Sequence, residues 1–122
     1  MIIKILSFGR KYGPVEADII LDARCMENPY WVENLRHLSG KDEAVRKFIL
    51  SNEESRNYLE KLGELMKLHA RMAEKRGRAQ LTIAAGCTGG RHRSVMMAEY
   101  LADTLKESYE VELIHRDIEK EA

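Results

Sequence analysis

The sequence predicts an α/β domain of three layers, built on a mainly parallel, four-stranded sheet that is flanked by helices. Four short segments are rich in Ile, Leu and Val without clean alternation with polar residues, which is typical of strands buried on both faces. Helical segments separate most of these strands, in the order β-β-α-α-β-α-β, and helical crossovers favour parallel pairing. We expect residues 1–122 to form a single domain, because a chain of 122 residues can bury a core of its own.

The four strands are predicted from apolar runs that are too short for buried helices. Residues 9–18, between the first two strands, hold two glycines and a proline and make a short connection. Whether the first two strands pair with each other therefore stays open. The predicted strands are Ile2–Phe8, Ile19–Ala23, Leu81–Ala85 and Val111–Ile114.

Three helices are predicted from apolar residues at helical spacing and from capping signals. Ser39 is placed to cap a short helix, and Ser51 with Glu54 forms a capping box for a long helix that should stop near Gly77. The third helix begins near Ser94. The side chains expected to face the core are Val45, Phe48 and Ile49 in the first helix, Leu59, Leu62, Leu65, Met66 and Met72 in the second, and Ala98, Leu101, Ala102 and Leu105 in the third.

The segment Gly86–Val95 joins the third strand to the third helix and is the most informative part of the chain. In such a unit the N–H groups of the loop and the N-terminus of the helix point to one spot, and both favour an anion. Arg91, His92 and Arg93 add positive charge and donors that suit phosphate oxygens. The segment predicts a phosphate-binding loop. The alternative is an ordinary glycine turn followed by a solvated basic patch.

Cationic residues follow the carboxyl end of every predicted strand. Parallel strands bring these ends to one edge of the sheet, where open α/β sheets bind ligands. We therefore expect Lys11, Arg24, Arg93 and Arg116 to surround one pocket that binds a phosphorylated small molecule, a nucleotide or an RNA backbone. The residues predicted at this edge are Arg10, Lys11, Arg24, Asn28, Thr88, Arg91, His92, Arg93, His115 and Arg116.

Trp31 is the only tryptophan, and it lies in a turn with Asn28, Pro29 and Tyr30. The sequence favours a role in covering the edge of the core, with stacking on a sugar or base ring as the alternative.

A second chemistry is compatible with the same loop. Cys87, Gly90, Arg93 and Ser94 have the Cys-x-x-Gly-x-x-Arg-Ser spacing of cysteine-dependent phosphatases, in which the thiolate attacks phosphorus and the arginine holds the phosphate. The leaving group would need a general acid, for which Asp22 and Asp117 are the candidates. The competing interpretation is that Cys87 is a small residue that fills the end of the strand.

Composition describes an ordinary soluble domain, with 44% hydrophobic and 33% charged residues and a formal net charge of zero. Two cysteines, an N-terminus without a basic leader and the absence of a membrane-length apolar run predict a cytoplasmic protein that does not bind a membrane. Neither the Gly-x-x-x-x-Gly-Lys-Ser/Thr motif nor a zinc-like Cys/His spacing is present. We expect no metal and no cofactor.

Several motifs together resemble the C-terminal domain of the RNase adapter protein RapZ family. The similarity runs from Ile5 nearly to the C-terminus, and its most distinctive part is Gly86–Val95. The other matching motifs are Ser7–Gly13, Asp22–Arg24, Asn28–Trp31, Leu35–Arg36, Ser39–Gly40, His115–Arg116 and Glu119–Lys120.

The resemblance implies a Rossmann-like domain related to a phosphofructokinase subdomain, one that binds small regulatory RNA and an amino-sugar phosphate and forms homo-oligomers. It places ligand contacts at Lys11, Tyr30, Thr88, Gly89, His92 and Arg93. The phosphate-binding loop adds Gly90 to the predicted ligand contacts, and the positions after the strands make Arg10, Arg24, Arg91, His115 and Arg116 the predicted RNA or edge contacts. The N-terminal ATPase domain usual in the family is absent from this sequence, which points to a stand-alone version.

The sequence departs from the family at two further points. The tail Asp117–Ala122 is less basic than that of RNA-binding members, and Tyr30 replaces a histidine found in some members. The function favoured by the sequence is a non-catalytic sensor of a phosphate ligand, an amino-sugar phosphate or a nucleotide-like compound. The less basic tail leaves open whether the domain is also an RNA-binding adapter, and the cysteine phosphatase is the alternative function.

Overall fold

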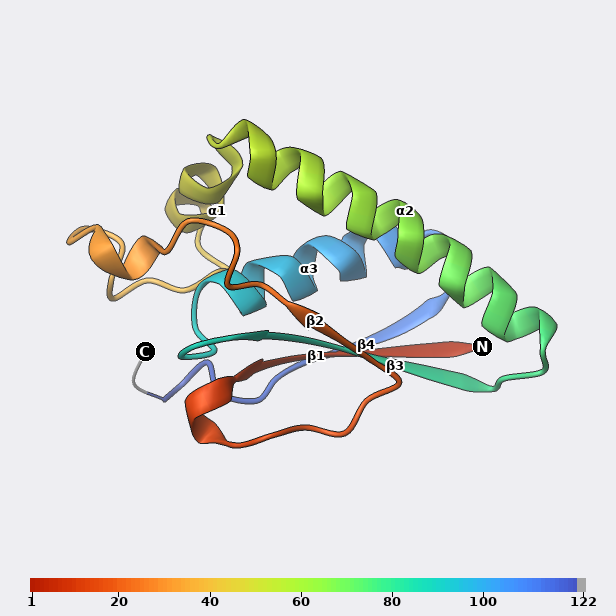
Figure 1. The fold of residues 1–122 in the computed structure, drawn as a ribbon. Coiled ribbons are helices and arrows are strands. Elements are labelled where there is room, and N and C mark those ends of the chain that lie inside the picture. Colours follow the sequence, from red (N-terminus) through yellow and green to blue (C-terminus); the bar gives the residue numbers. More distant parts are fainter. Residues whose placement is uncertain (121–122) are drawn as a thin grey trace.

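A computed structural model describes residues 1–120 of the chain and shows one four-stranded sheet with helices packed on it (Figure 1). All strand pairs are parallel, and the strand order is β2-β3-β1-β4. The expected α/β class and parallel sheet are confirmed. The elements are β1 (Ile2–Gly9), the 3-10 turn η1 (Arg10–Tyr12), β2 (Ile19–Asp22), the 3-10 turn η2 (Pro29–Trp31), α1 (Glu43–Leu50), α2 (Glu53–Lys75), β3 (Gln80–Cys87), α3 (Arg93–Leu105) and β4 (Glu110–His115).

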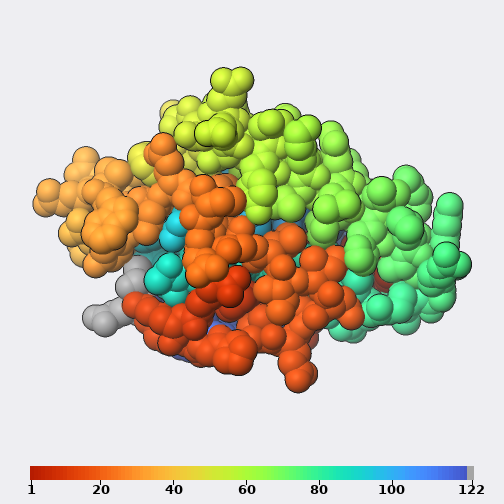
Figure 2. Space-filling model, viewed as in Figure 1, coloured from red at the N-terminus to blue at the C-terminus, as the bar shows by residue number. Residues whose placement is uncertain are grey.

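The layers are stacked in the order α2, α3 and sheet (Figure 1). Helix α3 lies directly on the sheet, and α2 crosses over α3 on the outside of the helical layer. Residues 10–18, drawn in orange, run beneath the sheet and are exposed on the front of the molecule in Figure 2. The helices thus cover one face of the sheet, while a loop crosses the other.

The core lies between the sheet and α3. Ile3 and Ile5 of β1 pair in register with Leu81 and Ile83 of β3, and all four side chains are fully buried. Because alternate residues of a strand share a face, these side chains form one apolar surface beneath the helices. Helix α3 adds Val95, Met96, Met97, Ala98 and Leu101, which are fully buried as well.

The open question about the first two strands is answered by the strand order. Strand β2 pairs with β3, not with β1, so the connection through residues 10–18 passes beneath β3 to reach the edge of the sheet. Strands β1 and β3 are the central neighbours, and Gly9 lies in register with Cys87. The loops that follow these two strands therefore start side by side.

Two predicted helix caps are wrong by one to three residues. Asp42, not Ser39, stands at the N-cap of α1, and its carboxylate accepts a hydrogen bond from the backbone N–H of Ser39. Helix α2 is capped by Asn52 in place of Ser51, with the Asn52 side chain accepting from the N–H of Ser55 at 2.9 Å. The shift arises because Ser51 still has helical backbone angles at the end of α1.

Two residues of α2 expected in the core are exposed. Leu65 and Met72 lie on the face of α2 that points away from α3, whereas Leu59, Leu62 and Met66 are buried. Apolar periodicity alone placed these two residues with the core, but an outer helix buries only one face.

No helix within residues 1–120 is long and apolar enough to cross a membrane. Glu121 and Ala122, the last two residues of the tail singled out above, lie outside the described residues.

Gly40 and Gly63 provide a matched test of the packing. A Cβ on Gly40 would lie 2.3 Å from the His92 carbonyl oxygen and 2.4 Å from the Met96 nitrogen, whereas one on Gly63 would make ordinary contact with Thr104 at 3.5 Å. We expect Gly40→Ala to lower the free energy of unfolding by about 2 kcal/mol or more, because the new methyl group would force the backbone around His92 and Met96 to move. Gly63→Ala should raise it by about 0.5–1 kcal/mol, because alanine favours a helix interior. Urea unfolding measures both, and equal effects would contradict this packing.

Candidate functional site

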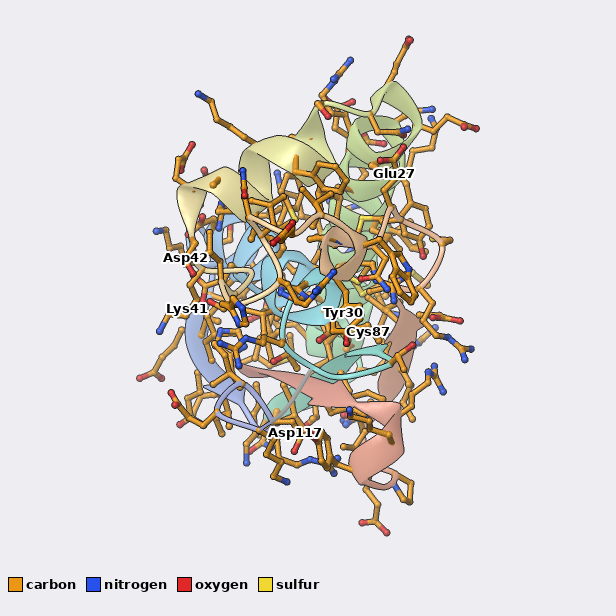
Figure 3. All side chains as sticks on the ribbon, turned by 90° about the vertical axis from the view of Figure 1, so that its left-hand side faces the viewer. Glu27, Tyr30, Lys41, Asp42, Cys87 and Asp117 are labelled. Atoms are coloured by element: carbon orange, nitrogen blue, oxygen red, sulfur yellow. The ribbon has the colours of Figure 1, made fainter. Side chains whose placement is uncertain are left out.

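A cavity of about 300 Å³ opens where β1 and β3 end, between the loop Thr88–His92 and the turn η2. Figure 3 looks onto this edge of the sheet, with Tyr30 and Cys87 close together near its centre. The cavity is lined by six of the predicted ligand contacts, Lys11, Tyr30, Thr88, Gly89, His92 and Arg93. It is also lined by Arg91, which was predicted as an edge contact, and by Asn28, Trp31 and Cys87.

Backbone-to-backbone packing holds the two loops at the floor of the cavity. The Lys11 N–H donates to the Thr88 carbonyl oxygen at 3.2 Å. Gly90 has a φ of 76°, and a Cβ built there would lie 2.5 Å from the nitrogen of Gly9. Only glycine combines this backbone angle with so close an approach. Gly90 thus serves the geometry of the loop and does not itself line the cavity.

Arg91 and His92 hold the segment that precedes α1. Arg91 donates from Nε to the Leu38 carbonyl at 3.1 Å and from its terminal nitrogen to the His37 carbonyl at 2.6 Å. His92 donates from Nε2 to the carbonyl of Arg36 at 3.2 Å, and burial lowers the pKa of this imidazole. Burial thus favours the neutral form of His92. Arg36 belongs to one of the motifs quoted from the sequence, but no sequence signal identified His37 and Leu38, because they contribute carbonyl groups that every residue has.

Arg93 is buried in the cavity wall, with 7% of its surface exposed. One terminal nitrogen donates to the carbonyl oxygens of Arg24 at 2.8 Å and Met26 at 3.2 Å. Its Nε is the one buried side-chain N or O atom in the described part of the chain that has no hydrogen-bond partner. An unpaired buried donor costs about 1–3 kcal/mol, so an acceptor at this place would be stabilising.

Cys87 lines the cavity, but its thiol is engaged by neighbouring groups. The sulfur accepts from the Gly90 N–H at 3.3 Å and donates to Ser94 Oγ at 3.1 Å, and the residue is buried. The same two partners would hold a thiolate only with the Ser94 hydroxyl donating to the sulfur instead of accepting from it. The geometry by itself therefore fits both interpretations of Cys87.

An aromatic wall closes the other side of the cavity. Tyr30 and Trp31 meet edge to face with their ring centres 5.1 Å apart, and the Arg36 guanidinium lies 5.1 Å from the centre of the Tyr30 ring. Trp31 is 75% exposed, so the expectation that it covers the core edge is wrong. Its turn projects from the domain, and the ring faces solvent beside the cavity.

Four of the predicted edge contacts lie outside the cavity. Arg10 and Arg116 flank the Phe8 ring, each 5.8 Å from its centre. Arg24 pairs with Asp22 at 2.9 Å and holds the pKa of that carboxyl at about 2. The expectation that Lys11, Arg24, Arg93 and Arg116 surround one pocket is thus wrong for Arg24 and Arg116, because local carboxylates and carbonyls bind their guanidinium groups.

The fourth, His115, is enclosed between β1 and α3. Its Nδ1 lies 2.6 Å from Ser7 Oγ, and its Nε2 lies 2.7 Å from a carboxylate oxygen of Glu99. Its side chain is 9% exposed, so little of the imidazole is open to the ligand or RNA contact predicted at His115.

Asp117, one of the two candidates for a general acid, has a structural role instead. It is fully buried beside the end of β1 (Figure 3), where it accepts from the Gly9 N–H at 2.8 Å and pairs with Arg116 and Lys120. Burial opposes its ionisation, but the Arg116 guanidinium, the Gly9 N–H and the Lys120 ammonium outweigh burial and hold the pKa of the carboxyl below its ordinary value. The residues that the structure describes contain no cluster of three or more His, Cys, Asp or Glu side chains suited to a metal.

Asp117→Asn tests this role through the pH dependence of folding. At pH 7 we expect it to lower the free energy of unfolding by about 1–3 kcal/mol, because buried donors lose a charged acceptor. A depressed folded-state pKa makes the contribution of Asp117 fully present above the ordinary value of 3.8 and removes it as the pH falls through the folded-state value. The difference between wild type and variant, measured by urea unfolding across this range, should therefore shrink in acid. A constant difference would contradict the assignment.

Comparisons with known proteins agree with the motifs. The model of the RapZ C-terminal domain family matches residues 1–119. The chain is 46% identical to a nucleotide-binding protein of Bacillus licheniformis over 98% of its own length and 41% of that protein. It is 46% identical to a nucleotide-binding protein of Caldanaerobacter subterraneus over 99% of its own length and 43% of that protein. It is 44% identical to nucleotide-binding protein YvcJ of Bacillus subtilis over 97% of its own length and 40% of that protein. The chain thus spans about two fifths of these relatives, and it belongs to the RapZ C-terminal domain family.

Proposed function

We propose that this domain is a non-catalytic sensor of a phosphorylated small molecule, an amino-sugar phosphate or a nucleotide-like compound. The observation that carries the proposal is the composition of the cavity wall. Lys11, Arg91 and Arg93 contribute positive charge, and the loop after β3 contributes main-chain groups at the start of α3. Cations and a helix N-terminus around one cavity favour a bound phosphate.

The unpaired Nε of Arg93 strengthens the argument. A phosphate oxygen near this atom would complete the hydrogen bonds of Arg93 while its terminal nitrogen keeps the carbonyls of Arg24 and Met26. Binding would also favour the charged form of His92, since an anion nearby opposes the effect of burial on this pKa. The cavity is thus suited to a dianion better than to a neutral sugar.

The aromatic wall suits the rest of the ligand. Trp31 and Tyr30 stand at the mouth of the cavity with apolar faces that a sugar or base ring can cover. The relatives are named nucleotide-binding proteins, and a nucleotide is a ring attached to phosphate. For this chain the ring remains part of the proposal.

The proposal includes the RNA-binding adapter role that membership of the RapZ family suggests. Arg10 and Lys11 are exposed beside the cavity and could meet a phosphate backbone. Arg24 and Arg116, in contrast, are neutralised by Asp22 and Asp117. A soluble adapter that recognises phosphate groups is consistent with both the small-molecule and the RNA part of this role.

Phosphosugar binding can be followed by the fluorescence of Trp31, which is the only tryptophan in the chain. We expect glucosamine 6-phosphate to change this fluorescence and, at about a hundredfold over its Kd, to raise the free energy of unfolding by about 2.7 kcal/mol. Glucosamine should do neither, because the phosphate supplies the binding energy. Arg93→Lys, which keeps the charge but loses the planar fork, should weaken binding at least about tenfold, or 1.4 kcal/mol.

Arg10→Ala is the matched control, since Arg10 follows the same strand as Lys11 but lies over Phe8 outside the cavity. It should leave the Kd unchanged. Equal responses to glucosamine and its phosphate, or equal losses in Arg93→Lys and Arg10→Ala, would contradict the proposed site.

A cysteine-dependent phosphatase is the second candidate, and the contacts of Cys87 with Ser94 and Gly90 are the observation in its favour. Two observations oppose it. The Arg93 guanidinium is directed to the carbonyls of Arg24 and Met26, and both candidate acids are engaged, Asp22 with Arg24 and Asp117 with Gly9, Arg116 and Lys120.

Cys87→Ser separates the two candidates. In a sensor we expect phosphosugar affinity to stay within about tenfold, because the sulfur only packs and makes hydrogen bonds with Gly90 and Ser94 that a serine hydroxyl can also make. A phosphatase would instead lose turnover, since serine is a poor nucleophile without an adjacent base. The measurements are hydrolysis of p-nitrophenyl phosphate and calorimetric titration of both proteins. Wild-type turnover that vanishes in Cys87→Ser would replace the sensor with the enzyme.

A further inference from the structure

The motif His115–Arg116, which the sequence singled out, contributes no side chain to the cavity. Arg116 instead begins the segment that follows β4 and runs beside the turn η1 (Figure 1). Its side chain is 29% exposed and forms an ion pair of 2.9 Å with the fully buried Asp117. Because this carboxylate neutralises the guanidinium, the role of Arg116 has to be found in its contacts with the protein.

Arg116 binds the backbone on both sides of η1. Its terminal nitrogens donate to the carbonyl oxygens of Gly13 at 2.9 Å and Pro14 at 3.0 Å, and one of them also donates to Gly9 at 3.4 Å. The Arg116 N–H donates to the carbonyl oxygen of Ser7 at 3.0 Å, which attaches the residue to the end of β1. One side chain therefore connects the end of β1 to the start of the loop that crosses beneath the sheet.

Asp117 and Lys120 add two further contacts with this region. The Asp117 carboxylate accepts from the Gly9 N–H at 2.8 Å and from the Lys120 ammonium at 2.7 Å. The same ammonium lies 4.8 Å from the centre of the Tyr12 ring. We refer to Arg116, Asp117 and Lys120 as the β4 clamp.

The turn held by the β4 clamp places Lys11 in the wall of the cavity. Turn η1 has only three residues and lies between Gly9 and Gly13, and so short a turn is not stable by itself. The Lys11 N–H donates to the Thr88 carbonyl at 3.2 Å, and the Lys11 ammonium lies 5.3 Å from the centre of the Tyr12 ring. A group that is held in position before the ligand arrives loses less freedom on binding, so the clamp can influence the phosphate site from outside it.

We propose that Arg116 is a positioning residue of the phosphate site, which holds η1 through the β4 clamp so that Lys11 stays in the cavity wall. The inference rests on the proposed function, since the position of Lys11 matters for binding only if an anion occupies the cavity. It gives the motif after β4 a role that needs no contact with a ligand or with RNA. Substitution of Arg116 should therefore weaken ligand binding only through Lys11.

Amide hydrogen exchange followed by NMR tests the clamp without a ligand. Arg116→Lys keeps a positive charge beside Asp117 but loses the fork that reaches the carbonyl groups, so exchange of the Lys11 N–H should become faster by about tenfold or more. Arg78→Lys is the matched control, because Arg78 pairs at 3.0 Å with Asp18, at the far end of the same connection. It should leave the Lys11 N–H unchanged. Equal rates in wild type and Arg116→Lys, or equal increases in both variants, would overturn the proposal.

Titration calorimetry of the full 122-residue chain with glucosamine 6-phosphate tests the role in binding. Lys11→Met and Arg116→Lys should each raise the Kd by about tenfold. The double variant should bind no more weakly than Lys11→Met alone, because both substitutions act through one side chain. Arg78→Lys should leave the Kd unchanged.

The outcomes distinguish this inference from the function on which it rests. Absence of binding by wild type would contradict the proposed function and, with it, the role of Arg116 in binding. Binding by wild type with an unchanged Kd in Arg116→Lys would overturn the positioning role alone. The same holds for losses that add in the double variant, because they would mean that Arg116 acts on the ligand independently of Lys11.

Discussion

The architecture of the site depends on the pairing of β1 with β3 at the centre of the sheet. Gly9 and Cys87, the last residues of these strands, lie in register, so the loops that follow leave the sheet next to each other. A side chain at Gly9 or Gly90 would collide with the backbone of the other loop. The cavity therefore has a floor of packed main chain, and its shape follows from the absence of side chains at two positions.

Hydrogen bonds from basic side chains connect the walls of the cavity to this floor. Arg91, His92 and Arg93 donate to carbonyl groups of residues 24, 26 and 36–38, segments that have no regular structure to satisfy those groups. Each side chain thus supplies the donor that a backbone N–H would supply to these carbonyl groups in a helix or sheet, and it connects the loop after β3 to one side of the cavity. Under the proposed function these donors would serve both structure and ligand, so we expect substitution at these positions to affect folding as well as binding.

Ion pairing with carboxylates distinguishes the arginines that hold the structure together from the cations that line the cavity. Arg24 and Arg116 also follow strands, yet Asp22 and Asp117 neutralise them, and Asp117 in addition caps the Gly9 N–H. A formal net charge of zero is consequently compatible with a cationic cavity. What matters is the position of the carboxylates, because no Asp or Glu is among the described residues that line the cavity.

The sequence by itself determined the α/β class, the parallel sheet, the four strands and the loop Gly86–Val95, because these depend on local apolar runs and on glycines next to basic residues. It also determined the family, since a dense motif carries that information directly. Only the tertiary structure decided that β2 lies beyond β3, that Trp31 faces solvent, that Leu65 and Met72 lie outside the core and that His115 is enclosed by Ser7 and Glu99. These outcomes depend on which elements pack against each other, and contacts between residues far apart in the chain leave no periodic signal in the sequence.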